Sequence, residues 1–421
     1  MDFSNFGRFL TRGSGIVQLM EDFGDAHAFD GEVFMLGGGN PGVVPAMQVK
    51  FREAMKSVLT DQPRFDSMVG AYDSPEGEIR FREAVAKLLR DTLGWQIETD
   101  NIAVTNGSQS SFFVLFNLFS GDYSLSPENK TRRHIMLPLT PEYIGYADAG
   151  LGESIFVSHR PHIERLDNNL FKYHVDLDSL EVDDSIGALC VSRPTNPTGN
   201  VLSDDEVDSL MQMARERDIP LILDCAYGSP FPNIVFTDAK PFWERGVILC
   251  LSLSKLGLPG VRTGIVVADN EVVRAISAAN AILSLAPGSF GPTLITEAVE
   301  SGDIIRWSNE LVKPFYRAKV DAAVIALQQA LAGLPFRIHQ PEGAIFLWLW
   351  FEGLPITSKE LYRRLKARGV FVLAGEHFFP GLEGSDWRHR YECIRVSYAG
   401  NADILNRGID IIAEEIRAAY R

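Results

Sequence analysis

Short runs of β-branched and other apolar residues alternate with longer amphipathic stretches through the middle of this 421-residue chain. The runs lie at residues 102–105, 135–139, 186–192, 221–223, 247–253 and 264–268. This alternation is typical of strands joined by helices, and it predicts an α/β fold with a mostly parallel sheet covered by helices. In such sheets ligands bind at the carboxyl ends of the strands, so the polar residues just after each run are the candidates for function.

The pattern changes from about residue 313 onward. A long helix is followed there by an apolar run at 344–351, a helix at 358–368, a run at 393–398 and a closing helix. We therefore predict a second, smaller α+β domain. Residues 1–55 are expected to form an N-terminal arm and part of the small domain, residues 56–312 the large α/β domain, and residues 313–421 the C-terminal small domain.

Charge and hydropathy exclude several classes of partner. A formal net charge of -15 without a Lys/Arg cluster disfavours nucleic acid. The longest apolar run, 344–351, is far shorter than the roughly 20 residues that cross a bilayer, and residues 1–20 lack the apolar core of a signal peptide. We expect a cytoplasmic protein with no membrane or nucleic-acid partner.

No spacing of cysteines or histidines predicts a metal site. The cysteines form no C-x-x-C pair and are expected to be buried, reduced thiols: Cys190, Cys225, Cys250 and Cys393. His159 and His162 are three residues apart, but a solvated loop pair outweighs a metal site because no H-E-x-x-H spacing occurs.

Three predicted strand ends supply an amide, a carboxylate with a phenol, and an amine: Asn196, Asp224 with Tyr227, and Lys255. A carboxylate facing a pyridine nitrogen keeps that nitrogen protonated, and an amide and a phenol can hydrogen-bond the ring oxygen. A lysine can serve as Schiff-base partner and general base, so the set favours pyridoxal chemistry. Taken singly, Asp224 is better explained as a strand-end cap and Lys255 as a surface residue. Because Asn196, Asp224, Tyr227 and Lys255 follow one another in this order at successive strand ends, the pyridoxal explanation becomes the stronger one for the set.

Two loops offer ligands for a phosphate. The loop 254–264 combines Ser254 and Arg262 with glycines and a proline, so that hydroxyls and a guanidinium can converge on one anion. Residues 105–110 precede a helix expected at 111–119, and the backbone amides of Gly107, Ser108 and Gln109 can meet an anion at its N-terminus. An ordinary helix N-cap would look much the same.

Two further residues are candidates for contact with the ring and the substrate. Tyr143, in Pro141-Glu-Tyr143, can stack on a flat ring, with core packing as the rival explanation. Arg395 interrupts the apolar run 393–398 with a charge, which is costly unless an anion is presented to it. A substrate α-carboxylate would meet that need, and an internal Asp or Glu partner is the alternative.

Together these residues resemble the fold-type-I aminotransferases, from Leu36-Gly-Gly-Gly-Asn-Pro41 to Arg395. The motifs that carry the resemblance are, in chain order, Asn196-Pro-Thr-Gly199, Asp224-x-x-Tyr227, Ser252-x-Ser-Lys255 with Arg262, and Arg395. The resemblance implies pyridoxal 5'-phosphate as the cofactor, with Lys255 as the catalytic Schiff-base lysine. The implied ring contacts are Asp224, Tyr227, Asn196 and Tyr143, and the implied phosphate ligands are Gly107, Ser108, Gln109, Ser252, Ser254 and Arg262.

The resemblance also implies a homodimer. Tyr72, in Tyr72-Asp-Ser-Pro-Glu-Gly77, is similar to the tyrosine that family members lend to the phosphate of the neighbouring subunit, so composite active sites are expected. Arg395 resembles the α-carboxylate clamp, with Asn196 also at the substrate. The stretch 37–39 resembles the backbone segment that closes over substrate, which implies that Gly38 and Gly39 contact it.

Four segments, at 36–41, 141–146, 192–199 and 342–350, narrow the resemblance. They are similar to members that exchange an amino group between valine or alanine and 2-oxo acids such as pyruvate and 2-oxoisovalerate, by a ping-pong route through pyridoxamine phosphate. The spacing from Lys255 to Arg262 is one residue shorter than in the aspartate-type enzymes, which leaves the phosphate role of Arg262 open. No clear second arginine for a dicarboxylate is present, and this favours a neutral side chain.

Two alternatives stay open, and a third is disfavoured. The chain can transfer amino groups of other neutral or aromatic amino acids, or act as a carbon-sulfur β-lyase on the same scaffold. A pyridoxal-sensing domain of a transcription regulator is disfavoured, because that class normally brings an N-terminal DNA-binding domain and only 35 residues precede Leu36 here.

Overall fold

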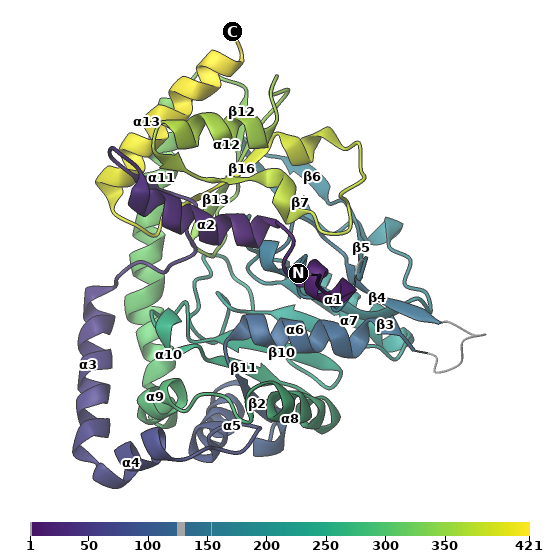
Figure 1. The fold of residues 1–421 in the computed structure, drawn as a ribbon, viewed down its shortest axis with the longest axis vertical. Coiled ribbons are helices and arrows are strands. Elements are labelled where there is room, and N and C mark those ends of the chain that lie inside the picture. The colour runs from purple at the N-terminus through teal and green to yellow at the C-terminus, as the bar shows by residue number, and fades with distance from the viewer. Residues whose placement is uncertain (1, 124–130, 153) are drawn as a thin grey trace.

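The structure is a computed structural model that describes residues 2–123, 131–152 and 154–421. Its larger sheet has eight strands (Figure 1). Seven follow one another in the order β2 (Ile102–Thr105), β11 (Gly264–Val267), β10 (Val247–Ser252), β9 (Leu221–Asp224), β8 (Ile186–Ser192), β4 (Arg132–Leu137) and β3 (Gly121–Asp122), and β5 (Phe156–Ser158) also pairs with β4. Only β11 and β3 run antiparallel to their neighbours among these strands. The predicted mostly parallel sheet is confirmed.

Both faces of this sheet are covered, which is why its strands are apolar without alternation. Helices α6 (Ser108–Phe119) and α8 (Asn270–Ser284) share a buried cluster with one face, through residues such as Phe112, Ile222 and Ile276. The alternate residues of the same strands face α5 (Ile79–Leu93), α7 (Asp204–Glu216) and α9 (Phe290–Glu300). The strand expected at 135–139 begins three residues earlier, at Arg132. Its first three residues are exposed or only partly buried, so they are polar and do not continue the apolar run.

A second, six-stranded sheet has the order β15 (Leu373–Ala374), β16 (Cys393–Ser397), β13 (Phe346–Phe351), β12 (Phe336–His339), β7 (Leu170–His174) and β6 (His162–Arg165). Helices α12 (Ser358–Ala367) and α13 (Ala402–Ala419) lie with it in the upper part of the molecule, and the long α11 (Lys313–Ala330) runs down toward the larger sheet (Figure 1). The segment 162–174, which the sequence division groups with residues 56–312, therefore joins the sheet built by the C-terminal strands.

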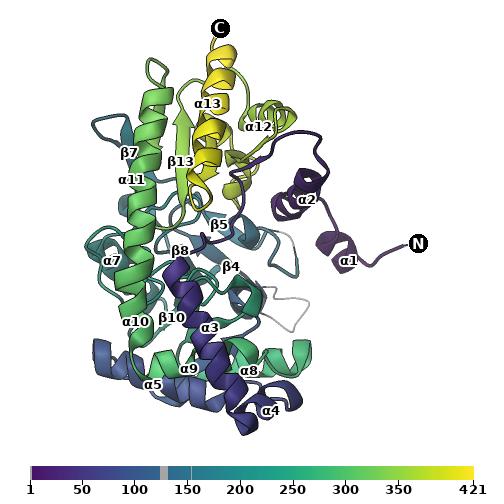
Figure 2. The ribbon, with the colours of Figure 1, turned by 90° about the vertical axis from the view of Figure 1, so that its left-hand side faces the viewer.

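The N-terminal segment lies across both layers. Helix α2 (Gly15–Ala28) stands beside the second sheet, α1 (Asn5–Leu10) lies at the level of β4 and β5, and α3 (Pro45–Thr60) and α4 (Gln62–Gly70) run along the side of the larger sheet (Figure 2). Asp22 of α2 accepts hydrogen bonds from Tyr362 at 2.5 Å and from Lys366 at 2.7 Å, which fasten α2 to α12. Strand β1 (Phe34–Met35) pairs with β14 (Val370–Phe371).

The four cysteines are buried and unbonded to one another, as predicted. Within the described ranges, no helix is long and apolar enough to cross a membrane.

Candidate active site

A cavity of about 170 Å³ lies at the carboxyl ends of β8, β9 and β10, where the two sheets meet. It collects residues that are widely separated in the sequence: Leu19, Gly39, Ser108, Gln109, Phe112, Tyr143, Asn196, Asp224, Ala226, Tyr227, Ser252, Ser254, Lys255, Arg262 and Arg395. All the predicted site residues are among these except Gly38, Gly107 and Tyr72. The loops after three strands thus meet at one edge of the sheet, as parallel strands require.

Asp224 ends β9 and is a buried carboxylate without an ion-pair partner among the described residues. Its Oδ2 accepts a hydrogen bond from the Tyr146 hydroxyl at 2.8 Å, and its Oδ1 accepts one from the backbone N–H of Ala226 at 2.9 Å. Burial raises the pKa of Asp224 to about 6, although both hydrogen bonds and the charge of Lys255 oppose the rise.

Lys255 reaches the same cavity from the turn after β10. Its Nζ donates a hydrogen bond to the backbone carbonyl of Gly39 at 2.6 Å and lies 5.3 Å from the centroid of the Tyr227 ring. Burial lowers the pKa of this amine to about 8, with the charges of Arg395 and Arg262 acting in the same direction. A lysine at this pKa has a substantial neutral fraction near neutrality, which a nucleophile or general base needs.

The N-terminus of α6 forms an anion-binding corner. The helix begins at Ser108 rather than at the predicted residue 111, and no side chain caps its first turn. Gly107 has φ 90°, and a Cβ there would stand 2.2 Å from Nη2 of Arg262, so the guanidinium packs directly on this glycine. Exposed amides, serine hydroxyls and a guanidinium are the donors that a phosphate takes.

Arg395 lies in β16 with only 1% of its surface exposed. Its Nη1 donates to Asn196 Oδ1 at 2.7 Å and its Nη2 to the carbonyl of Gly37 at 2.6 Å, while its Nε has no partner in the described part of the chain. No Asp or Glu of that part pairs with it, so among the described residues its partners are an amide and a carbonyl rather than a carboxylate. Burial lowers the pKa of this guanidinium to about 10.

Tyr143 lines the cavity and also packs edge-on against Tyr146, with the ring centroids 5.5 Å apart. It therefore packs as a core residue on one side and faces the cavity on the other, and its stacking on a flat ring stays a prediction. Tyr72 lies outside the cavity with 81% of its surface exposed.

Several residues that were not predicted from the sequence stand behind Asp224 or line the cavity. Tyr146, Ser192 and Glu142 form a buried hydrogen-bonded group behind the carboxylate. All three lie within the segments 141–146 and 192–199 that were singled out, so their polarity in apolar surroundings was the available signal. Leu19 and Phe112 carried no such signal, because ordinary core positions look the same.

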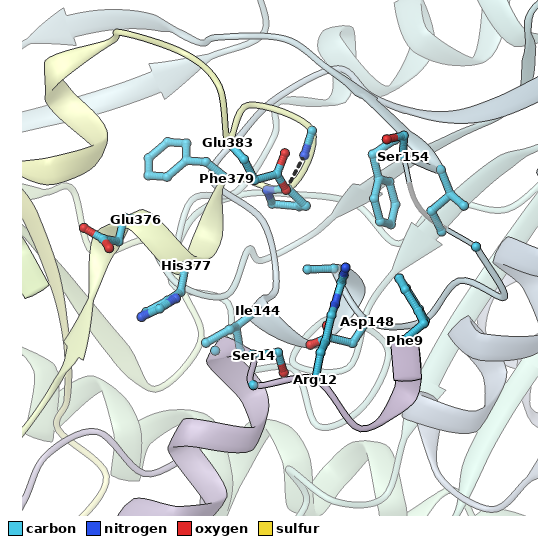
Figure 3. A pocket seen from close by; sticks show the side chains of 18 residues that line it. Phe9, Arg12, Ser14, Ile144, Asp148, Ser154, Glu376, His377, Phe379 and Glu383 are labelled. Atoms are coloured by element: carbon cyan, nitrogen blue, oxygen red, sulfur yellow. Dashed lines mark hydrogen bonds and ion pairs between the residues drawn. The ribbon is translucent and has the colours of Figure 1, made fainter. Parts of the chain in front are cut away.

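A larger cavity of about 580 Å³ lies between the N-terminal segment and the loops around residues 144–156 and 376–383 (Figure 3). It contains Arg12, whose guanidinium lies 3.8 Å from Asp148, and the carboxylates of Glu376 and Glu383. None of its lining residues was predicted for the site, and the described residues that line it include no lysine. The smaller cavity, with its unpaired carboxylate, amine and guanidinium, is therefore the candidate active site.

Comparison with known proteins identifies close relatives over the whole length of the chain. The family model for aminotransferase class I and II matches residues 48–412. Valine–pyruvate aminotransferase of Escherichia coli K12 is 48% identical over 420 residues, which cover 100% of this chain and 99% of the relative.

Two solved structures share this similarity. A putative amino-acid aminotransferase from Psychrobacter arcticum 273-4 superposes with a TM-score of 0.96 at 46% identity, covering 100% of this chain and 99% of the other. A valine-pyruvate aminotransferase from Salmonella typhimurium LT2 superposes with a TM-score of 0.88 at 47% identity, covering 97% of this chain and 100% of the other.

Proposed function

Because the chain belongs to the class I and II aminotransferase family, we propose that it exchanges the amino group between valine or alanine and 2-oxo acids such as pyruvate and 2-oxoisovalerate. The observation that carries this proposal is the 48% identity to the valine–pyruvate enzyme over essentially both complete chains. The reaction then follows a ping-pong course, in which the oxo acid formed from the donor leaves before the acceptor binds.

Enzymes of this family use pyridoxal 5'-phosphate, which when bound supplies an electron sink for a carbanion at the substrate α-carbon. The residues at the candidate site fit this group. Asp224, a buried carboxylate without a cation, suits the protonated ring nitrogen, and Asn196 and Tyr227 suit the ring oxygen. The uncapped first turn of α6, Arg262 and the nearby serines suit the phosphate: Ser108, Ser252 and Ser254.

The roles that we propose for the remaining residues follow from their charge. Lys255 would hold the cofactor covalently and, once released, its Nζ would take the proton from the substrate α-carbon and pass it to the cofactor, which would keep the amino group. Arg395 binds the substrate α-carboxylate, and its unpartnered Nε and neutral hydrogen-bond acceptors support that role. Gly38 and Gly39 bring the backbone beside the substrate, with the Gly39 carbonyl on Lys255.

The lining of the cavity supports a neutral side chain on the substrate. Leu19, Phe112 and Ala226 supply apolar surface, and Arg262 and Arg395 are the only arginines among the lining residues of the described chain. With these two assigned to the phosphate and the α-carboxylate, no guanidinium is left for a second substrate carboxylate.

We further propose a homodimer with composite sites. Tyr72 is exposed, as are the apolar residues Ile282, Leu285 and Phe290, and Ser289 donates a hydrogen bond to Asp73 at 2.5 Å, which brings the segments of Phe290 and Tyr72 together. Exposed apolar side chains that gather in one region support a partner surface there. This surface adjoins the anion-binding corner, because Asn106, next to Gly107, accepts a hydrogen bond from the Gly288 N–H at 2.9 Å. A partner subunit on it can extend its own Tyr72 to the phosphate.

The division into residues 1–55, 56–312 and 313–421 and a cytoplasmic location also remain proposals. Four buried thiols that form no disulfide support a reducing compartment.

A panel of amino donors against pyruvate and 2-oxoisovalerate tests the proposed function. We expect valine with pyruvate to give 2-oxoisovalerate and alanine, and valine alone to give one equivalent of 2-oxoisovalerate per site, because the first half-reaction needs no acceptor. Aromatic donors should react far more slowly. Release of pyruvate and ammonia from cysteine-type substrates without an acceptor, together with inactivity on valine, would identify a β-lyase instead.

A further inference from the structure

A chain of three buried polar side chains stands behind Asp224, on the side away from the cavity. Tyr146 donates its hydroxyl proton to Asp224 Oδ2 at 2.8 Å, and its oxygen lies 3.3 Å from Ser192 Oγ. Ser192 Oγ lies 2.5 Å from Glu142 Oε2. At most 2% of any of these three residues is exposed, so the chain is shielded from bulk solvent.

Glu142 is a carboxyl group in surroundings that disfavour its charge. Its oxygens accept hydrogen bonds from the backbone N–H groups of Ser192 at 2.8 Å and Tyr143 at 3.3 Å, and within the described residues it has no ion-pair partner. Burial, with the charge of Asp224, raises the pKa of Glu142 to about 8, against the opposing hydrogen bonds. The other titratable or charged groups around this carboxyl and Asp224 are Tyr143, Tyr146, Tyr227, Cys190, Cys225, Cys250 and Lys255.

Counting protons shows what a neutral Glu142 does for the chain. Each hydroxyl has one proton, and Tyr146 uses its own on Asp224. If Glu142 is ionised, Ser192 gives its proton to Glu142, and the Tyr146 oxygen receives none. If Glu142 carries a proton on Oε2, it donates to Ser192, and Ser192 can donate to Tyr146. Every proton then points toward Asp224, and hydrogen bonds aligned in this way reinforce one another.

We propose that Glu142 is a neutral carboxylic acid at the end of a proton-donor chain, through Ser192 and Tyr146, that fixes Asp224 in place as a carboxylate. The three are positioning residues, since none of them lines the cavity. The use of Asp224 as the partner of the ring nitrogen rests on the proposed function, but the direction of the chain does not. A neutral donor stabilises the charge of Asp224 without adding a second negative charge beside it.

Two substitutions at Glu142 in the cofactor-loaded enzyme test this arrangement. Glu142→Gln retains a donor toward Ser192 and an acceptor for its N–H, whereas Glu142→Leu removes both. We expect Glu142→Gln to keep most of kcat/KM at pH 7 and Glu142→Leu to lose about 10-fold or more, as for loss of a hydrogen bond to a charged group. In Tyr146→Phe the acid limb of the kcat/KM profile should move to higher pH, because Asp224 loses a donor that lowers its pKa.

Two readouts do not depend on substrate. The infrared C=O band of a protonated carboxylic acid should be present at pH 7 and disappear in Glu142→Gln. Because the pKa of Glu142 is raised above its ordinary value, wild-type stability falls as pH rises from about 4.5 to about 8. The melting temperature of Glu142→Gln relative to wild type should therefore increase over that range.

Glu392→Gln is the matched control. Glu392 is equally buried but ion-paired with Arg388 at 2.7 Å and hydrogen-bonded to Trp350, so this variant should melt lower and lose no carboxylic-acid band. An intact infrared spectrum in Glu142→Gln, with activity as low as in Glu142→Leu, would overturn the proposal. Loss of the band in a protein that transfers no amino group would leave the chain standing and refute the proposed function.

Discussion

Two buried arginines show how differently this molecule treats charge in two regions. Arg193, just after β8, donates hydrogen bonds to the carbonyls of Leu202 and Lys240. It also donates one to the carboxylate of Asp204 at 2.6 Å. Arg395, in β16, has only neutral acceptors and a spare Nε. A charge neutralised within the fold stabilises the fold, whereas a charge left uncompensated beside a cavity is available to a ligand.

Two lysines differ in the same way, one being paired with a carboxylate and the other not, and substituting them is expected to give the largest effect on activity. Lys172 pairs with Glu342, whereas Lys255 contacts a carbonyl and faces the cavity. Lys255→Ala should lower amino transfer by about 10³-fold or more, since both covalent attachment and proton transfer are lost. Lys172→Ala should instead destabilise the protein by about 3 kcal/mol, because it leaves a buried carboxylate unpaired.

Single-turnover assays and thermal unfolding of both lysine variants measure this difference. If Lys255→Ala still forms a borohydride-stable adduct with the cofactor, the assignment of Lys255 is wrong.

The arginines themselves give the next largest effect. Arg395→Leu should reduce kcat/KM for valine by about 10²-fold, as for loss of a desolvated charge pair, with a smaller loss of stability than Arg193→Leu, because it strands two neutral acceptors but no carboxylate. Arg193→Leu should show the opposite balance, a loss of about 2–4 kcal/mol in unfolding free energy from the stranded carbonyls and Asp204. Steady-state kinetics and urea unfolding of the two variants give the comparison. Equal destabilisation by both would remove the distinction between the regions.

The carboxylates of the two regions should respond to pH in opposite directions. Burial would raise the pKa of Asp204, but the hydrogen bond from Arg193 and further favourable contacts lower it. Its contribution to stability is therefore present above its ordinary pKa and is lost as pH falls. Asp224 has a raised pKa of about 6, so its contribution is present at low pH and is lost as pH rises to about 6.

Activity, unlike the stability contribution of Asp224, should rise with pH as Asp224 ionises, because only its ionised form pairs with a protonated ring nitrogen. We expect kcat/KM to fall by about 10-fold per pH unit below about 6. Melting curves of Asp204→Asn and Asp224→Asn between pH 3 and 7 should show slopes that depart from wild type in opposite directions. Parallel slopes would contradict the assignment.

The sequence predicted the positions that depend on local pattern. Each of the six apolar runs corresponds to a strand. Contacts between distant segments could not be predicted from local pattern, because they depend on how whole elements pack together. Examples are the pairing of β7 with β12, the contact of Ser192 with Glu142 across 50 residues, and the position of Leu19 in the cavity. The surroundings of Arg395 needed the structure as well, because a charged residue in an apolar strand is compatible with either kind of partner.

Tyr72 gives the smallest expected effect and extends the comparison to the surface. With 81% of its surface exposed, its hydroxyl makes no contribution to the subunit alone, so Tyr72→Phe should change unfolding free energy by less than about 0.5 kcal/mol. If the partner's tyrosine donates to the phosphate, cofactor affinity should fall by about 10-fold. Equilibrium dialysis of the cofactor, with sedimentation to verify the dimer, measures this loss. If the affinity is unchanged in a dimeric variant, each subunit completes its own phosphate site, and the residues that bind the cofactor all belong to one chain.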